Sequence, residues 1–304
     1  MRASLIGGWF VLILVVAHAG CGGGGGAPAG PNLEEMKTRL LKSTDPSAKA
    51  RGLASLAEKQ AKVGDIAGAD SSLTTAVAAA EMIKDPVSQA TALANIGGAY
   101  ARIEKPIEAK STLKAAERAA EKITELEHKT NAAGEIAVAY VAAGEVDTAK
   151  YLLKTAEEGA EKIERPAGKI TSLIRIASAY QRSKDTGEAT RILDAAVELA
   201  RALEEPREKL EALADAAVIA AKCEAGEKAT ALFEEAKKLA EQITEPSAQA
   251  HAFVSLTKKA VAAGNKGLGK DLIAKAEALA NKIKDGSVQG PLLEEISKVK
   301  TTVH

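Results

Sequence analysis

Residues 125–164 read ELEHKTNAAGEIAVAYVAAGEVDTAKYLLKTAEEGAEKIE, and this stretch sets the organisation of the chain. Its first half carries apolar side chains at the helical spacing i, i+3, i+4 and i+7: Ala133, Ile136, Ala137 and Tyr140. Gly144 follows, and glycine accepts the left-handed backbone that ends a helix. A second apolar run with helical spacing comes after it. The stretch therefore predicts two helices joined by a tight turn.

The same pattern recurs six times without insertion or deletion, in units 45–84, 85–124, 125–164, 165–204, 205–244 and 245–284. Proline takes the second position of five units, with Leu126 in the third: Pro46, Pro86, Pro166, Pro206 and Pro246. Proline suits the first turn of a helix because its missing N–H has no intrahelical partner there. Asp45 and Asp85 stand just before it as expected N-caps.

The turn and the second helix also have recurring positions. Glycine marks three turns (Gly64, Gly144 and Gly264), and the other three have a weaker signal, with Glu104, Lys184 and Glu224. One bulky apolar row runs through the second helices: Leu73, Leu113, Leu153, Leu193, Phe233 and Ile273. Alanines beside a bulky residue form the knob and groove that close helix stacking requires.

Both ends of the array look like half-repeats that cap it. Residues 33–42 match the later part of a second helix, and residues 292–300 match a first helix. One hairpin cannot bury its apolar face alone, whereas stacked neighbours can. We therefore expect an all-α solenoid of six helix-turn-helix repeats over 33–304, with half-repeat helical caps and the C-terminal cap at 285–304.

The third unit resembles the tetratricopeptide repeat. The positions that match are Ile136, Ala137, Tyr140, Gly144, Ala149, Leu153 and Ala156. The resemblance covers residues 45–284 and implies a right-handed α-solenoid. The period of 40 exceeds the usual 34, which implies longer second helices, as in the kinesin light chain type. Ala133 stands where the family has an early Trp. HEAT repeats have a similar period and are the second choice.

The resemblance also implies a concave groove, lined by first helices, that binds peptides or protein segments. The residues mapped to this groove are Arg102, Asn131, Thr171, Ser178, Arg182, Glu211, Lys222 and His251. One row in it holds cations, Lys62, Arg102, Arg182 and Lys222, that could attract an acidic segment. The competing interpretation of each residue is ordinary solvated surface.

The N-terminus is expected to be an export signal. Residues 5–16 form an apolar run of 12, which suits a signal peptide and is too short to span a membrane. Ala19-Gly20-Cys21 resembles the bacterial lipobox, which implies a signal peptide over 1–20, a lipidated Cys21 and a Gly/Pro-rich tether over 21–32. His18 departs from that pattern, and cleavage after Ala19 is the alternative. Gly22 is compatible with the outer membrane of a Gram-negative cell.

Composition and motifs argue against several kinds of chemistry. Lys+Arg and Asp+Glu are equal at 41 each, so the basic excess typical of nucleic-acid binders is missing. The four histidines are far apart and have no metal-ligand spacing. Cys223 and the recurring tyrosines 100, 140 and 180 are interpreted as packing residues. We expect no enzymatic activity, no cofactor and no metal.

The functional expectation combines the repeats and the signal. It is a lipid-anchored scaffold of the bacterial envelope, facing the periplasm if the cell is Gram-negative, that binds a protein or peptide ligand. Contact with the membrane is expected only through the N-terminal lipid. The alternative is an envelope lipoprotein associated with glycan or peptidoglycan.

Overall fold

The computed structural model describes residues 32–303, which form α-helices joined by short connections. The fourteen helices are α1 Leu33–Leu41, α2 Pro46–Lys62, α3 Ile66–Glu81, α4 Pro86–Arg102, α5 Pro106–Glu121, α6 Leu126–Ala142, α7 Val146–Glu161, α8 Pro166–Arg182, α9 Thr186–Arg201, α10 Pro206–Lys222, α11 Gly226–Glu241, α12 Pro246–Ala262, α13 Lys266–Ala280 and α14 Gly286–Val303. The expected all-α solenoid of paired helices is confirmed. The signal peptide, Cys21 and the tether as far as Pro31 lie outside the described residues.

First helices begin where the proline signature places them. The Asp45 carboxylate accepts hydrogen bonds from the backbone N–H groups of Ser47 at 3.0 Å and Ala48 at 3.2 Å. Asp85 caps α4 in the same way, accepting from the N–H of Ser88 at 2.8 Å. These bonds satisfy amides that the first turn leaves without an intrahelical partner. Both expected N-caps are therefore confirmed.

All six turns inside the repeats share one backbone geometry. Gly64, Gly144 and Gly264 have φ of 84°, 80° and 80°. Glu104, Lys184 and Glu224 have φ of 59°, 62° and 60°, so they adopt the same left-handed conformation without being glycine. A residue with a Cβ is strained there by about 1–2 kcal/mol. These three turns lack the glycine signal, and the repeat keeps the left-handed conformation there despite the strain.

The core is a continuous ladder of alanine and aliphatic side chains. The bulky row of the second helices is at most 3% exposed in every unit: Leu73, Leu113, Leu153, Leu193, Phe233 and Ile273. The recurring tyrosines 100, 140 and 180 are buried too, and Tyr140 donates a hydrogen bond to Glu117. Burial, followed by that bond, raises the pKa of Tyr140. The expectation that these tyrosines are packing residues agrees with this placement.

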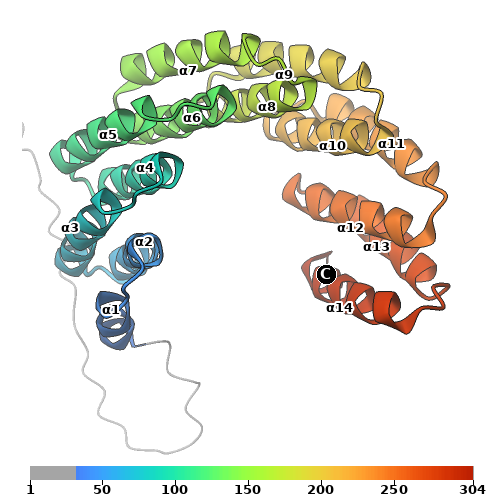
Figure 1. Cartoon of the computed structure of the whole chain (residues 1–304), viewed down its shortest axis with the longest axis horizontal. Coiled ribbons are helices and arrows are strands. Elements are labelled where there is room, and N and C mark those ends of the chain that lie inside the picture. The colour runs from blue at the N-terminus through green and yellow to red at the C-terminus, as the bar shows by residue number, and fades with distance from the viewer. Residues whose placement is uncertain (1–31, 304) are drawn as a thin grey trace, which may run out of the picture.

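The helix pairs stack into an open arc, seen in Figure 1. Even-numbered helices form the inner layer and odd-numbered helices from α3 to α13 the outer layer. Each first helix contacts the first helix of the next unit, whereas second helices pack mainly on first helices. Because the inner layer is the more closely packed, the array curves toward it. The concave face is therefore built from first helices.

The two ends of the arc are single helices. Asn32 caps α1, accepting from the N–H of Glu34 at 3.1 Å. Helix α14 begins at Gly286, six residues before the stretch that matched a first helix. Its earlier start follows from Asp285, which accepts from the N–H of Ser287 at 2.9 Å. Among residues 32–303, no helix is both long enough and apolar enough to cross a membrane.

Candidate functional site

The concave face carries open hollows in the seams between successive first helices. Two of them lie between α2 and α4 and between α8 and α10, each with a volume of about 430 Å³. A smaller hollow of about 170 Å³ lies between α6 and α8. Grooves of this kind suit an elongated ligand better than a compact one, because they are open along the helices and enclose nothing completely.

Four residues mapped to the groove come from one helical row, and the structure gives each a different setting. Asn131 is half-buried in the hollow between α6 and α8, and its Oδ1 atom is buried without a hydrogen-bond partner. Thr171 on α8 and Glu211 on α10 both line the hollow between these helices. His251 lies farther along, with Nδ1 3.6 Å from Glu295 Oε2 on α14. This row does line the concave face but does not converge on one point.

The mapped cations lie toward the turn edge of the groove. Arg102 is paired with Glu58 at 2.5 Å, so its charge is already balanced. Arg182 and Lys222 are exposed, and among the ion pairs of the described residues neither takes part in one. The Gln181 side chain donates to the Lys222 carbonyl oxygen at 3.2 Å, which joins the ends of α8 and α10. These two cations are therefore neighbours on the rim.

A row that sequence reasoning missed lies four residues after the first one. Its members are Ser55, Asn95, Glu135, Arg175, Asp215 and Ser255, most of them exposed on first helices. Glu135 accepts from the Thr91 hydroxyl at 3.0 Å and lies 3.9 Å from Arg175. The i+4 spacing was the available signal, since residues four apart share a helix face. Arg175 and Asp215 belong to the site as much as the mapped residues do.

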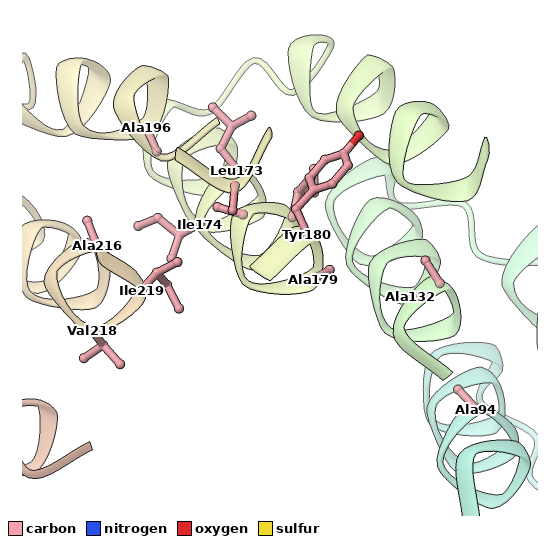
Figure 2. Close-up of a cluster of buried hydrophobic side chains, with 14 of the residues drawn as sticks. Ala94, Ala132, Leu173, Ile174, Ala179, Tyr180, Ala196, Ala216, Val218 and Ile219 are labelled. Atoms are coloured by element: carbon pink, nitrogen blue, oxygen red, sulfur yellow. The ribbon is translucent and has the colours of Figure 1, made fainter. Parts of the chain in front are cut away.

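The hollow between α8 and α10, the α8–α10 slot, has an apolar floor and a charged rim. Its floor consists of Ile170, Ile174, Leu203, Val218 and Ile219. Its rim carries Thr171, Arg175, Ser178, Glu208, Glu211 and Asp215. The lining residues on each helix follow a spacing of three or four over eleven positions. The slot therefore runs parallel to the two helices. Figure 2 shows Ile174 and Ile219 pointing toward one another across it.

The other large hollow is less suited to a ligand. It lies at the turn edge between α2 and α4, where Ala57, Ala61 and Ala99 make much of its wall. The Glu58–Arg102 ion pair joins its two sides. A ligand there would meet small side chains and a charge pair that already satisfies itself. The α8–α10 slot offers more apolar contact and less internal pairing.

Ion pairs elsewhere in the groove tie neighbouring helices together. Lys259 on α12 lies 3.0 Å from Glu211 and also pairs with Asp215 on α10. Lys258 pairs with Glu295 at 2.7 Å, and hydrogen bonding from this lysine lowers the pKa of Glu295. Glu208 is also an exposed acid of the slot. Unlike Glu211 and Asp215, it takes part in no ion pair within residues 32–303.

The convex face also carries charges that pair across units. Arg191 lies 2.8 Å from Glu157, Arg201 lies 3.0 Å from Glu235, and four further pairs link successive units: Asp70 with Lys105, Lys110 with Glu145, Asp194 with Lys228, and Glu241 with Lys275. Exposed pairs of this kind contribute little each, on the order of 0–1 kcal/mol. They fit a solvated outer surface.

Nothing in the described part of the chain assembles a reactive centre that we can identify. Residues 32–303 contain no group of three or more His, Cys, Asp or Glu side chains placed to hold a metal ion. Cys223 is half-buried at the end of α10, and burial raises the pKa of its thiol. A thiol with a raised pKa is a poorer nucleophile at neutral pH. Its placement agrees with a packing role.

Comparisons with known proteins return structures only. No family model matches the chain, and no curated protein matches it. One similar structure is Ton1535 from Thermococcus onnurineus NA1, at 14% identity and TM-score 0.46, covering 86% of this chain and 94% of that one. Another is a Podosopora anserina putative kinesin light chain with nearly identical TPR-like repeats. It has 23% sequence identity and a TM-score of 0.40, and the match covers 67% of this chain and 100% of that one. A Rap protein complexed with competence and sporulation factor is similar at 14% sequence identity and a TM-score of 0.38, and the match covers 89% of this chain and 79% of that one.

Proposed function

We propose that this protein is a scaffold that binds a protein or peptide segment in its concave groove. The observation that carries the proposal is the α8–α10 slot, with its apolar floor and charged rim. Buried apolar contact supplies affinity, and charges at the rim supply orientation and specificity. On the convex face, a hollow of about 510 Å³ between α7 and α9 is lined by charged side chains and Tyr180 and has no aliphatic floor.

The proposal includes export and a lipid anchor. Its support is the sequence pattern that ends at Cys21, followed by a Gly/Pro-rich stretch that would act as a tether. A tether would let the groove reach partners near the membrane while the repeats stay in the aqueous phase. The site of action would then be the cell envelope.

Crosslinking from chosen positions tests the binding face. A photoreactive amino acid would replace Arg175 in the groove or, as a matched control, Tyr151, which is 70% exposed on α7. We expect discrete crosslinked protein bands from position 175 in cells and none from position 151. Equal patterns from both positions would contradict a groove-specific role, and recovery of peptidoglycan alone would favour the glycan alternative.

The anchor has its own test in the full-length chain. Metabolic labelling with a clickable fatty acid should label the wild-type protein and leave the Cys21→Ala variant unlabelled. An unlabelled wild-type protein that is cleaved after Ala19 would show that the chain is exported without a lipid. That result would remove the anchor from the proposal and leave the groove unaffected.

A further inference from the structure

Two bulky side chains distinguish the α8–α10 slot from the other seams between repeat units. Counting from the first residue of each unit, position 10 is Ile174 in α8, and position 15 is Ile219 in α10. At the other seams the position-10 residues are Ala54, Ala94, Gly134 and Ala214, and the position-15 residues are Ala99, Ala139, Ala179 and Lys259. The two isoleucines therefore give this slot bulkier apolar walls than the alanines give the hollow of equal volume between α2 and α4.

Charges of opposite sign lie at the two ends of this slot. Glu208 lies near the start of α10, at the end where Leu203 contributes to the floor. Lys222 ends α10 just beyond Val218 and Ile219 at the opposite end, whereas Arg182 at the end of α8 lines the neighbouring hollow between α6 and α8. Glu208 and Lys222 are 14 positions apart, which on a helix is about 21 Å. The slot therefore has an apolar floor, an acid without an ion pair among the described residues at one end and Lys222 beyond the other, while the rim acids between them, Glu211 and Asp215, are paired with Lys259.

An extended peptide matches this layout in length and in periodicity. Alternate side chains of a strand share one face, and residues rise by about 3.3 Å each. A side chain at position 1 of a peptide and one at position 7 are thus about 20 Å apart on the same face. Side chains at positions 3 and 5 are separated by about 6.6 Å, which is close to the 6 Å rise between residues four apart on a helix. Ile170 and Ile174 of the floor have that spacing.

We propose that the α8–α10 slot binds an extended segment with the order basic-x-aliphatic-x-aliphatic-x-acidic. The basic side chain faces Glu208, the aliphatic pair packs on Ile170, Ile174 and Ile219, and the acidic side chain faces Lys222. The reverse order of charges would put like charges together at both ends, which is unfavourable. This specificity rests on the proposed function, because it describes what the groove accepts.

Three synthetic peptides test the proposal by fluorescence anisotropy. The first is Lys-Ser-Leu-Ser-Leu-Ser-Glu with Gly flanks and a fluorescein label. The second exchanges its Lys and Glu, and the third replaces both Leu with Ser. With the mature protein, the first should bind at least tenfold more tightly than either of the others. Equal binding of the three peptides would overturn the proposal. So would no binding of the first peptide at 1 mM protein, since a dissociation constant of 1 mM corresponds to a binding free energy of about −4 kcal/mol.

A charge exchange in the protein gives the sharpest control. The Glu208→Lys and Lys222→Glu double variant changes exposed side chains and should reverse the preference between the first two peptides. The matched control is Glu227→Lys with Lys270→Glu, an exposed pair of opposite charges on the second helices α11 and α13. It should leave the preference unchanged. An unchanged preference in the Glu208/Lys222 variant would overturn the assigned direction.

Failure of this inference can be told apart from failure of the proposed function. If the peptides do not discriminate while position 175 still crosslinks a protein in cells, the groove binds a partner by other chemistry. If position 175 gives no groove-specific crosslink, the proposed function itself fails.

Discussion

The seam between α4 and α6 and the seam between α8 and α10 come from the same repeat, but they are built differently. Helices α4 and α6 lie against each other over more residues than the other successive first helices do. A Cβ added at Gly98 would lie only 3.7 Å from the Cβ of Ala139 on α6. Across the other seam, Ile174 faces Ile219 beside a hollow of about 430 Å³. Side-chain size at two positions thus distinguishes these two seams, although the α2–α4 seam also has a hollow of about 430 Å³ with alanines at the same positions.

The largest expected effect comes from placing the bulky pair in the close seam. Ala94→Ile with Ala139→Ile adds six carbon atoms where both alanines are buried. Overpacking of this kind costs about 1–3 kcal/mol at each site, so the free energy of unfolding should fall by about 2–6 kcal/mol. Urea denaturation followed by circular dichroism measures it. If the free energy of unfolding fell by less than it does in the surface variant Lys270→Glu, the packing argument would be contradicted.

The reciprocal change should have a smaller effect on stability. Ile174→Ala with Ile219→Ala removes apolar carbons that border an open slot, so we expect a loss of about 1–3 kcal/mol, less than for fully enclosed sites. The slot should also lose its apolar floor, and the Leu-containing peptide should bind at least tenfold more weakly. Retained stability with undiminished peptide binding would show that the two isoleucines do not form the site.

The turns that follow α4 and α10 test whether backbone strain contributes to the difference between the two seams. Glu104 follows α4 and Glu224 follows α10, and both have positive φ. Substitution of either by glycine should stabilise the protein by about 0.5–1 kcal/mol, because the strain is removed and part of the gain is offset by chain entropy. Gly144→Ala should destabilise it by a similar amount. Unequal effects at Glu104 and Glu224 would mean that the turns contribute to the difference between the seams.

The smallest effect concerns the cap of α4. Hydrogen bonding from the hydroxyl and the backbone amide of Ser88 lowers the pKa of Asp85. A carboxylate with a lowered folded-state pKa stabilises the fold above its unfolded pKa, near 3.9, and this contribution disappears as pH falls through the folded pKa. The difference in melting temperature between wild type and Asp85→Asn should therefore shrink below about pH 4. A difference that stays constant from pH 6 to pH 2 would contradict this role of the carboxylate.

The sequence predicted the fold well and the site only in part. Period, prolines and turns are local signals, and they place the first helix of each of the six units to within a residue of its observed start, whereas the C-terminal cap helix begins six residues before the stretch matched to it. The row that includes Arg175 was missed although its i+4 spacing from the mapped row placed it on the same helix face. The slot was missed because Ile174 and Ile219 are 45 positions apart and meet only across a seam. Each looks like an ordinary apolar helix residue by itself.

Methyl NMR of the isoleucine side chains tests the central claim most directly. The protein would be labelled at the Ile δ1 methyl groups and titrated with the Lys-Ser-Leu-Ser-Leu-Ser-Glu peptide. Ile174 and Ile219 should shift progressively, while Ile96 and Ile136 on α4 and α6, both buried, should stay unchanged. Shifts confined to Ile96 and Ile136, or no shifts at all, would contradict the assignment of the slot between α8 and α10 as the binding site.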